Sequence, residues 1–243
     1  MKVLVLGHKG MLGHMVHWYL TSKWTNHDVI TTDLRWPTDE FKKKILDFDG
    51  DYVVNCIGAI HQRADNFDVN SELPIWLDDN LTNCRVIHPG TDCEMDDDDY
   101  GNSKRKATEY LIEKGNVTKI IKTSIIGPEL NTKSSLMEWF LDSEGEISGY
   151  TKAYWNGNTT LWWAKICDSM MLNWDEYETL NVPVTQCISK YELLNTIKDV
   201  YGKDIQINKN SDVEMNKCLE KTFDIVTHHI KTQLIYMRNI YGN

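Results

Sequence analysis

Apolar and polar positions alternate along the first half of the chain in a pattern that predicts strands and helices in turn. Lys2–Leu6 is a short, mostly apolar run suited to a buried parallel strand, and the apolar residues of Met15–Leu20 repeat at helical spacing. Further strands are predicted at Asp28–Asp33, Asp51–Gly58, Arg85–His88 and Thr118–Ser124, and helices at Ser71–Asn83 and Gly101–Lys114. The alternation predicts an α/β fold with a Rossmann-type, doubly wound parallel sheet.

Three glycines, Gly7, Gly10 and Gly13, stand between the first predicted strand and the first helix. Glycine lets the backbone approach a pyrophosphate closely, and the free N–H groups and dipole of a helix N-terminus favour anions. The spacing is G-x-x-G-x-x-G rather than G-x-G-x-x-G. The second strand ends at Asp33, which is placed to accept a hydrogen bond from a ribose hydroxyl. Together these features predict a dinucleotide site.

The second half of the chain is less regular, because loops that contain Gly and Asn interrupt the pattern after Gly127. Ser189 and Glu192 have capping-box spacing, which predicts a helix that continues to Tyr201. We expect two parts. Residues 1–126 and 155–189 would form an NAD(P)-binding Rossmann domain, and residues 127–154 and 190–243 a small C-terminal substrate-binding lobe.

Composition and charge limit the partners. The chain has 243 residues and 41% hydrophobic content, enough for a large core without disulfides. A net charge of −10 argues against nucleic acid or an anionic membrane as partner. No signal peptide or membrane span is recognised, so a cytoplasmic location is expected. The six cysteines form no C-x-x-C pair, and we expect reduced thiols. The acidic run Asp96–Asp99 is interpreted as a solvated loop.

Tyr100 and Lys104 are the candidate catalytic pair, because residues four apart on a helix leave the same face. A lysine ammonium beside a phenol favours the phenolate, and moving a tyrosine pKa from about 10 to near neutrality takes on the order of 4 kcal/mol. We expect Lys104 to lower the pKa of Tyr100 and make it a usable general acid. Most such pairs are solvated helix faces, and the preceding dinucleotide loop is what favours catalysis here.

Several motifs carry a family resemblance over nearly the whole chain. Besides the glycine loop they are Asn55-x-x-Gly58, Val69-Asn70-Ser71-Glu72-Leu73-Pro74, Thr91-Asp92, Tyr100-Gly101-x-Ser103-Lys104, Thr123–Leu130, Gly149-Tyr150-Thr151 and Trp155-Asn156-Gly157. In this order and spacing the chain resembles the extended short-chain dehydrogenase/reductases, and within them the dTDP-4-dehydrorhamnose reductases and related nucleotide-sugar 4-keto-reductases.

The resemblance implies NAD(P)H-dependent reduction of a UDP- or dTDP-linked 4-keto-6-deoxyhexose. Tyr100 would protonate the C4 oxygen while hydride arrives at C4, Thr91 would hydrogen-bond that oxygen, and Lys104 would hold the nicotinamide ribose. Cofactor contacts are expected from Gly7, Lys9, Gly10, Met11, Leu12, Gly13, Asp33, Arg35, Cys56, Ile57, Gly58, Tyr100 and Lys104. Substrate contacts are expected from Asn131, Tyr150, Trp155 and Asn156. Relatives are often longer, which leaves the assembly open, a homodimer being possible.

Cys93 stands where the related 4,6-dehydratases carry glutamate, which disfavours dehydration. In the resembling epimerase/reductases that make GDP-fucose and UDP-rhamnose, a cysteine at this position is the acid/base that inverts carbons beside the ketone. A thiol whose pKa of about 8.5 is lowered by positive charge could take such a proton. Lys133 is the candidate carrier on the opposite ring face. We therefore expect C3, or C3 and C5, epimerisation before reduction, giving a deoxysugar such as L-rhamnose or a 2-acetamido-2,6-dideoxy-L-hexose for glycan synthesis.

Cofactor choice depends on opposing charges. Asp33 would favour NAD(H), because a carboxylate repels a 2′-phosphate, whereas Lys9 and Arg35 favour NADP(H), which we expect. No metal site is expected, since the histidine pairs of the chain lack surrounding ligands. Two alternatives stay open: a monofunctional 4-keto-reductase with Cys93 as a packing residue, and a non-catalytic NADP-binding regulatory subunit.

Overall fold

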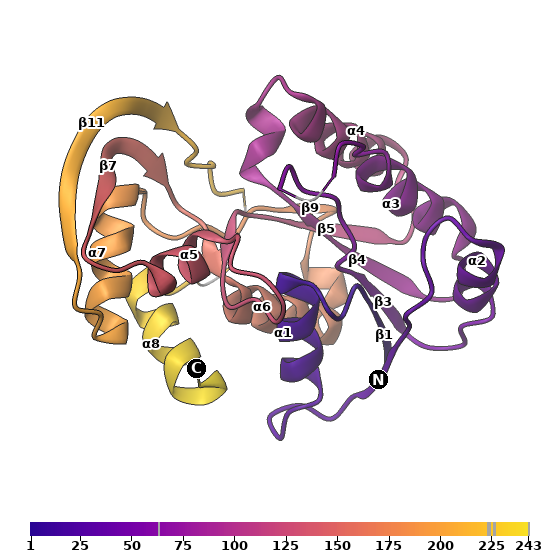
Figure 1. The fold of residues 1–243 in the computed structure, drawn as a ribbon. Helices are drawn as coiled ribbons and strands as arrows, with labels where there is room; N and C mark the ends of the chain where they lie inside the picture. Colours follow the sequence, from indigo (N-terminus) through magenta and orange to yellow (C-terminus); the bar gives the residue numbers. More distant parts are fainter. Residues whose placement is uncertain (63, 223–224, 226, 243) are drawn as a thin grey trace.

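A six-stranded parallel sheet forms the centre of the molecule in a computed structural model that describes residues 1–62, 64–222, 225 and 227–242. Its strand order is β2–β1–β3–β4–β5–β9. The strands are β1 (Lys2–Leu6), β2 (Asp28–Thr31), β3 (Tyr52–Asn55), β4 (Arg85–Gly90), β5 (Thr118–Lys122) and β9 (Leu180–Asn181). Helices connect them on both faces (Figure 1). The predicted α/β, doubly wound fold is confirmed.

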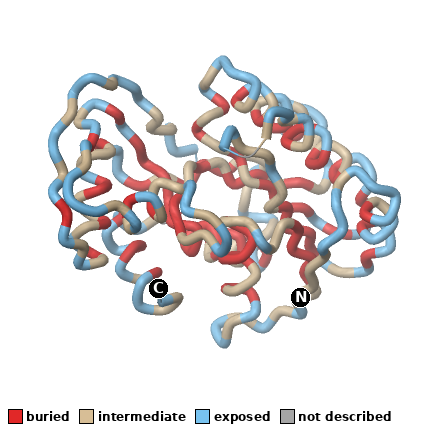
Figure 2. The backbone as a smooth tube through the Cα atoms, in the orientation of Figure 1, coloured by how far each residue is buried: buried red, intermediate tan, exposed pale blue. Residues whose placement is uncertain are grey.

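Two hydrophobic cores lie on opposite faces of this sheet, because successive side chains of a strand point to opposite sides. The first core joins Val3, Val5 and Val54 to α1 (Met11–Leu20) and α6 (Thr160–Leu172). The second joins alternate residues of the same strands to α2 (Asp39–Leu46) and α3 (Val69–Asn80). The helix α4 (Asp99–Lys114) packs beside α3. Figure 2 shows the buried positions gathered in the middle of the molecule.

The order of the strands reverses between β1 and β3, since the chain goes from β1 to its neighbour β2 and then crosses back to β3 on the other side. Loops that leave such a pair of strands diverge and open a crevice at the carboxyl edge of the sheet. The glycine loop follows β1, and residues Cys56–Gly58 follow β3. The topology therefore places the predicted cofactor residues at the switch point of the sheet.

A second, three-stranded sheet of order β10–β7–β11 lies beside the central one (Figure 1). It consists of β7 (Glu146–Trp155), β10 (Ile188–Ser189) and β11 (Gln206–Asn216), with α5 (Leu136–Asp142), α7 (Lys190–Tyr201) and α8 (Ile230–Tyr241) around it. A further pair of short strands, β6 (Ile125–Ile126) and β8 (Asn158–Thr159), connects the two regions. Residues of α7 and α8 share the first hydrophobic core with α1 and α6, so the two regions pack continuously.

Helix ends follow local sequence signals. The predicted capping box is confirmed at α7, where the Glu192 N–H donates to Ser189 Oγ at 3.2 Å and Glu192 Oε2 accepts from the Ser189 N–H at 2.7 Å. Two predicted helices begin earlier than expected, at Val69 for α3 and at Asp99 for α4. Among the described residues, no helix has both the length and the apolar character needed to cross a bilayer.

One disulfide corrects the expectation of reduced cysteines. Cys187, directly before β10, is bonded to Cys218, two residues after β11. The other four cysteines, Cys56, Cys84, Cys93 and Cys167, are free. The bonded pair has no recognisable spacing because its members are 31 residues apart in sequence. They meet because β10 and β11 pair with opposite edges of the same strand, β7, near its C-terminal end.

Candidate active site

A cavity of about 530 Å³ lies at the carboxyl edge of the central sheet, at the switch point. It brings together Thr91, Cys93, Tyr100 and Lys104 with the glycine loop. Its other lining residues come from the loop after β3, from the ends of β4 and β5 and from the segment before α5: Cys56–Ile60, Gln62, Ala64, Pro89, Gly90, Asp92, Thr123–Ile125, Glu129 and Ser134–Leu136. The structure thus collects four of the five predicted catalytic residues, together with the predicted cofactor residues Gly10–Leu12 and Cys56–Gly58, from distant parts of the sequence.

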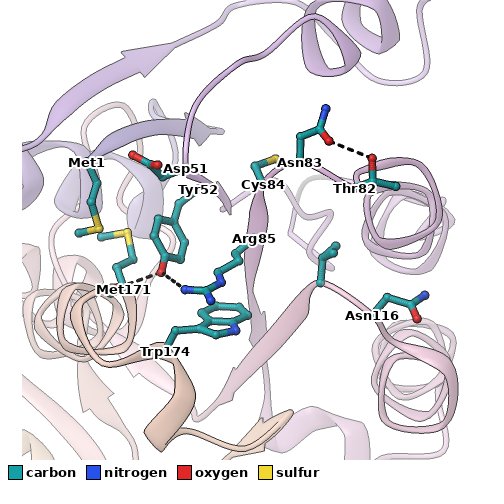
Figure 3. Close-up of a pocket in the computed structure, with 11 residues that line it drawn as sticks. Met1, Asp51, Tyr52, Thr82, Asn83, Cys84, Arg85, Asn116, Met171 and Trp174 are labelled. Atoms are coloured by element: carbon teal, nitrogen blue, oxygen red, sulfur yellow. Dashed lines mark hydrogen bonds between the residues drawn. The ribbon is translucent and has the colours of Figure 1, made fainter.

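A larger cavity, of about 650 Å³, lies at the opposite edge of the sheet (Figure 3). Its lining comes from the amino ends of β3, β4 and β5, and includes Tyr52, Arg85 and Trp174. None of the predicted site residues, all of which are in the described part of the chain, lines it. Ligand chemistry in open parallel sheets belongs at the carboxyl edge, so the smaller cavity is the candidate active site.

The glycine loop can accept an anion at the N-terminus of α1. Gly7 has φ +74°, and a Cβ there would lie 2.8 Å from the Cys56 carbonyl, while a Cβ on Gly13 would lie 2.1 Å from the Gly7 oxygen. Only glycine therefore allows this close approach of loop, helix and β3. Gly10 is the N-cap of α1 and supplies no side-chain hydrogen bond, and the first turn contains no acidic residue. The first residues of the helix, Met11 and Leu12, line the cavity, at the end of α1 where backbone N–H groups have no partner within the helix.

Basic side chains surround Asp33 beyond the end of β2. Lys9 Nζ lies 2.6 Å from Asp33 Oδ1, and His8 Nε2 lies 3.7 Å from the same oxygen. A hydrogen bond from Lys9 lowers the pKa of the Asp33 carboxyl, and the charges of Lys9, His8 and Arg35 act in the same direction. Asp33 is therefore already balanced by positive charge in the protein, which weakens its expected repulsion of a 2′-phosphate.

Thr91 is positioned by a capping box at the end of β4. It is the N-cap of η1 (Asp92–Met95), where its Oγ1 accepts from the Cys93 N–H at 3.3 Å, and its own N–H donates to Glu94 Oε1 at 2.9 Å. Glu94 is buried and forms an ion pair of 2.7 Å with Lys122 of β5. Sequence reasoning gave Glu94 no role, although the spacing Thr91-x-x-Glu94 is the capping-box signal.

Tyr100 lies in the first turn of α4, which Asp98 caps by accepting from the Gly101 N–H at 2.6 Å. Burial raises the pKa of the Tyr100 phenol, and Cys93 and Asp92 raise it further, against a hydrogen bond with Thr91. The expectation that the pKa of Tyr100 is lowered is therefore wrong, because burial outweighs the neighbouring charge. A phenol with a raised pKa stays protonated at neutral pH, which is the form that donates a proton.

Lys104 is buried, one helical turn beyond Tyr100, with its ammonium beside Gly58, where a Cβ would lie 3.5 Å from Nζ. Burial lowers its pKa, and the charge of Glu94 opposes this effect. Within the described residues its ammonium forms no hydrogen bond or ion pair, yet Lys104 lines the cavity. A buried ammonium that faces a cavity without a protein acceptor is suited to hold hydroxyl groups of a ligand.

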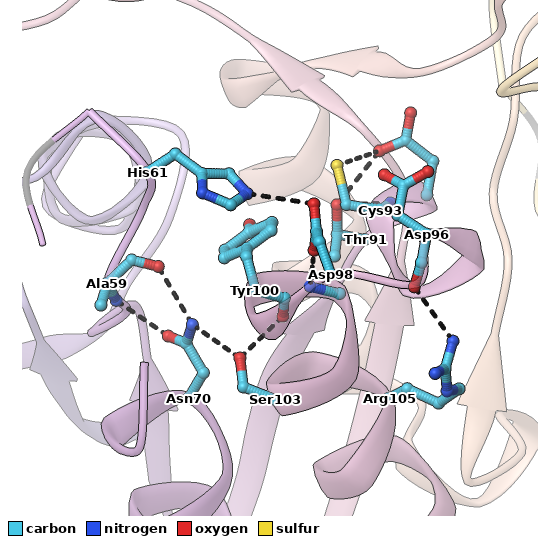
Figure 4. Close-up of polar contacts among 12 residues, drawn as sticks. Ala59, His61, Asn70, Thr91, Cys93, Asp96, Asp98, Tyr100, Ser103 and Arg105 are labelled. Atoms are coloured by element: carbon cyan, nitrogen blue, oxygen red, sulfur yellow. Dashed lines mark hydrogen bonds and ion pairs between the residues drawn. The ribbon is translucent and has the colours of Figure 1, made fainter. Parts of the chain in front are cut away.

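Asn70 connects the loop after β3 to α4 (Figure 4). Its amide oxygen accepts from the Ala59 N–H at 2.8 Å, and its amide nitrogen donates to the Ala59 carbonyl at 3.0 Å and to Ser103 Oγ at 3.2 Å. Ser103 in turn donates to the Tyr100 carbonyl at 2.7 Å. Sequence reasoning quoted Asn70 within a motif but gave it no role. Asn70 is fully buried and bonds both the loop after β3 and α4, so it fixes the separation of the two.

Two aromatic rings pack against Tyr100 from the same loop region. The ring centroid of His61 lies 5.1 Å from that of Tyr100, and the centroid of Phe67 lies 5.7 Å from it. His61 Nε2 lies 3.3 Å from Asp98 Oδ2, so the same histidine contacts the cap of α4 (Figure 4). These contacts restrict the Tyr100 ring. They could not be read from the sequence, since His61 and Phe67 lie in a segment without regular periodicity.

Cys93 is half-buried beside Thr91 and Tyr100, with Sγ 3.7 Å from Asp92 Oδ1. Burial raises the pKa of its thiol to about 11, and the Asp92 carboxylate adds to this rise. The expected lowering of the Cys93 pKa by positive charge is therefore wrong, because burial and the neighbouring Asp92 carboxylate both raise it. The predicted position of Cys93 in the site is found, but its thiol is a weaker acid than expected.

Comparisons with known proteins point to one fold. No protein-family model and no curated protein matches the chain. Among solved structures, dTDP-4-dehydrorhamnose reductase from Clostridium acetobutylicum is 17% identical, with a TM-score of 0.73 over 100% of both chains. The reductase of the same name from Bacillus anthracis, in complex with NADP, is 12% identical, with a TM-score of 0.74 over 99% of each chain. The chain shares the fold of these reductases.

A third structure with the same fold is GDP-mannoheptose C4 reductase from Campylobacter jejuni with NADP bound. It is 13% identical, with a TM-score of 0.67, and the match covers 100% of this chain and 98% of that one. At such identities the similarity concerns the arrangement of the backbone, and the chemistry has to be argued from the side chains in the cavity.

Ten residues predicted in the site are not among those that line the cavity. Five of them belong to the predicted cofactor set: Gly7, Lys9, Gly13, Asp33 and Arg35. The other five were predicted for catalysis or substrate binding. Lys133 is exposed and forms an ion pair with Asp142 of α5. Asn131 and Tyr150 are exposed, the latter on β7. Trp155 belongs to the hydrophobic core, and the Asn156 amide is bound to the backbone of Leu219. Their predicted roles in epimerisation and substrate binding stay predictions. Within the described residues, no group of three or more His, Cys, Asp or Glu side chains could hold a metal ion.

Proposed function

We propose that this protein is an NADPH-dependent reductase of the 4-keto group of a UDP- or dTDP-linked 4-keto-6-deoxyhexose. The observation that carries the proposal is the convergence of Thr91, Tyr100 and Lys104 on one cavity beside a glycine loop at a helix N-terminus. The shared fold with reductases that are named for nucleotide-sugar 4-keto substrates supports the substrate class.

The residues of the cavity fit a dinucleotide. The glycine cradle and the first N–H groups of α1 would hold its pyrophosphate, and the Lys104 ammonium would hold a ribose. The cluster of Lys9, His8 and Arg35 around Asp33 supports a 2′-phosphate, hence NADPH rather than NADH. When bound, the cofactor would supply the hydride that the protein itself cannot provide.

Three side chains would then orient the substrate, donate the proton and hold the site in place. Thr91 would orient the sugar ketone by a hydrogen bond to its oxygen, since the capping box holds its backbone in place. Tyr100 would donate its phenolic proton to that oxygen as negative charge develops on it. Because burial keeps the phenol neutral at physiological pH, the proton is available at the start of each cycle. The loop held by Asn70 would keep Tyr100 and the cofactor pocket at a constant separation.

Epimerisation at C3, or at C3 and C5, is a second proposal that rests on Cys93 alone. Cys93 lines the cavity next to Thr91, the residue proposed to bind the ketone oxygen, and its backbone N–H donates to Thr91 Oγ1. The raised pKa of its thiol and the position of Lys133 outside the cavity lining favour plain 4-reduction over the bifunctional reaction.

NADPH oxidation measured against a panel of UDP- and dTDP-linked 4-keto-6-deoxyhexoses, in D2O with NMR analysis of the products, tests both proposals. Turnover with some member of the panel supports the reductase, and the deuterium content at C3 and C5 reports epimerisation. Tight NADPH binding without turnover of any member would contradict the proposed function and leave a non-catalytic, NADP-binding role.

Lys9→Ala is expected to weaken NADPH binding much more than NADH binding. The lost charged contact with a 2′-phosphate is worth roughly 1.5–3 kcal/mol, about tenfold or more in Kd. The variant also leaves Asp33 without its ion-pair partner, and the freed carboxylate repels the phosphate. Cofactor fluorescence titration measures both constants, with Lys23→Ala, an exposed lysine beyond α1, as control. Equal losses for the two cofactors would show that Lys9 does not face the phosphate.

Cys93→Ser is expected to abolish any exchange of the C3 proton with D2O while reduction of an already epimerised substrate continues. A serine hydroxyl is too weak an acid to replace a thiol, whereas Thr91, Tyr100 and Lys104 are unchanged. Because the pKa of the Cys93 thiol is raised to about 11, exchange by the wild type should increase with pH through the alkaline range. Absence of exchange in a wild type that reduces the ketone would make Cys93 a packing residue.

A further inference from the structure

A short segment after β11 reaches from the three-stranded sheet to the catalytic residues. We name residues 217–219 the β11 tail. The Lys217 N–H donates to the Tyr154 carbonyl at 3.0 Å, at the end of β7. Asn156 binds Leu219 twice, through Nδ2 to its carbonyl at 2.8 Å and through Oδ1 from its N–H at 3.0 Å. The tail is therefore fixed to the end of β7 on both sides of Cys218.

The side chain of Lys217 forms an ion pair with Asp96, in the turn between η1 and α4. The two side chains are 15% and 36% exposed, so the pair is shielded from solvent on the lysine side. This contact corrects the interpretation of the acidic run as a solvated loop at Asp96 only, since Asp97, Asp98 and Asp99 are exposed. The sequence could not indicate the pair, because its members are 121 residues apart.

Asp96 lies between the catalytic side chains along the chain. Its N–H donates to the Cys93 carbonyl at 3.0 Å, and its own carbonyl accepts from Arg105 Nη1 at 3.2 Å. The backbone of this turn packs closely on Gly101, where a Cβ would lie 2.7 Å from the Asp96 carbonyl oxygen. A displacement of Asp96 would thus shift η1, with Thr91 and Cys93, relative to α4, with Tyr100.

The Cys187–Cys218 disulfide holds the residue next to Lys217 in sequence. Cys187 is exposed and Cys218 is half-buried, so a thiol in solution can reach the bond. Without the disulfide, the tail keeps its hydrogen bonds to the end of β7 and the Lys217–Asp96 pair but loses its covalent link to the residue before β10. The bond therefore ties the position of Lys217 to the edge strand β10 as well as to β7.

We propose that Lys217 is a positioning residue for the catalytic segment 91–100, and that the Cys187–Cys218 disulfide makes this positioning sensitive to thiol reductants. A dithiol would transfer two electrons and two protons to the bond, which yields the two cysteine thiols and the cyclic disulfide of the reductant. In the reduced protein the β11 tail is less restrained and the Lys217–Asp96 pair weakens. As a result, η1 shifts relative to α4. The kinetic part of this proposal rests on the proposed function.

Hydrogen–deuterium exchange of the whole protein tests the positioning independently of activity. In Lys217→Gln, in Cys187→Ser and in dithiothreitol-treated wild type, peptides across residues 91–101 should exchange about fivefold faster or more, which corresponds to a local loss of roughly 1 kcal/mol. Peptides of β1 and β3 should not change. Dithiothreitol should have no further effect on Cys187→Ser, which has no disulfide to reduce.

Steady-state NADPH oxidation gives the functional readout. The same three samples should show kcat lowered by about tenfold to a hundredfold, as expected for misplaced catalytic groups, with an unchanged Kd for NADPH because the glycine loop is not contacted by the tail. Lys217→Arg should restore the ion pair and most of the rate. Lys152→Gln, which removes an exposed 3.4 Å pair with Glu214 in the same sheet, is the matched control and should behave as wild type.

Two results would overturn the proposal. One is unchanged exchange of residues 91–101 in Lys217→Gln and in the reduced wild type. The other is a wild type that turns over substrate at the same rate with and without its disulfide. A wild type that reduces no nucleotide sugar would contradict the proposed function instead, and the exchange experiment would still decide whether Lys217 positions the segment.

Discussion

Tyr100→Phe is expected to lower kcat by roughly 10²–10⁴-fold, the range that general acid catalysis supplies. The phenylalanine ring keeps the packing against His61 and Phe67 but leaves the developing alkoxide without a proton donor. NADPH binding should be retained, because the glycine loop and Lys104 are unchanged. Steady-state NADPH oxidation, with the cofactor Kd from fluorescence titration, measures the two effects separately.

Tyr110→Phe is the matched control for this prediction. Tyr110 lies on the same helix, ten residues further along, and its hydroxyl donates to Asp79 at 2.7 Å on the exposed surface. Loss of that hydroxyl removes a surface hydrogen bond and no group from the cavity. A Tyr100→Phe enzyme that retains most of the rate of Tyr110→Phe would show that another group delivers the proton and would contradict the assignment.

Glu94→Ala is expected to lower the free energy of unfolding by about 3–5 kcal/mol, the cost of leaving a buried ion-pair partner alone. Lys122, with its side chain only 18% exposed, would lose its 2.7 Å contact, and the Thr91 N–H would lose its acceptor. Urea denaturation monitored by tryptophan fluorescence measures the change. The variant should also lose activity, since Thr91 is no longer held at the end of β4.

Two further variants separate charge from geometry in this prediction. Glu94→Gln keeps an acceptor for the Thr91 N–H but removes the charge that Lys122 needs, so its stability should fall between those of the wild type and Glu94→Ala. Asp47→Ala removes an exposed pair with Lys43 and should change the stability far less, because solvent screens such pairs. Similar small losses for Glu94→Ala and Asp47→Ala would show that the buried pair contributes little.

Each kinetic test should state whether the Cys187–Cys218 disulfide is oxidised or reduced. The sequence predicted free thiols at these positions, whereas the structure has a disulfide. Reducing agents are commonly added to protect free cysteines, and here they would also open the Cys187–Cys218 bond. Buried Cys84 and Cys167 need little protection. Activity measured with and without a dithiol therefore distinguishes a protein that depends on its β11 tail from one that does not.

Local signals explain why much of the fold was readable from the sequence. The central strands are short apolar runs because both faces of a parallel sheet are covered, and the glycine loop requires residues without a Cβ at Gly7 and Gly13. The capping box at Ser189 and the common face of Tyr100 and Lys104 depend only on neighbours within one helical turn. Such features are encoded within a few residues, and the sheet topology then brings them to one edge.

The sequence by itself determined the alternating α/β order and the glycine loop after the first strand. It also predicted Thr91, Tyr100 and Lys104 as a catalytic group, and the structure places these three residues in the lining of one cavity. Only the tertiary structure decided the electrostatics, since the pKa of Tyr100 depends on burial by segments far away in the chain. The same holds for the Lys217–Asp96 pair and the Cys187–Cys218 bond, whose members are 121 and 31 residues apart. Contacts of this kind arise from strand pairing and packing, which residue spacing does not report.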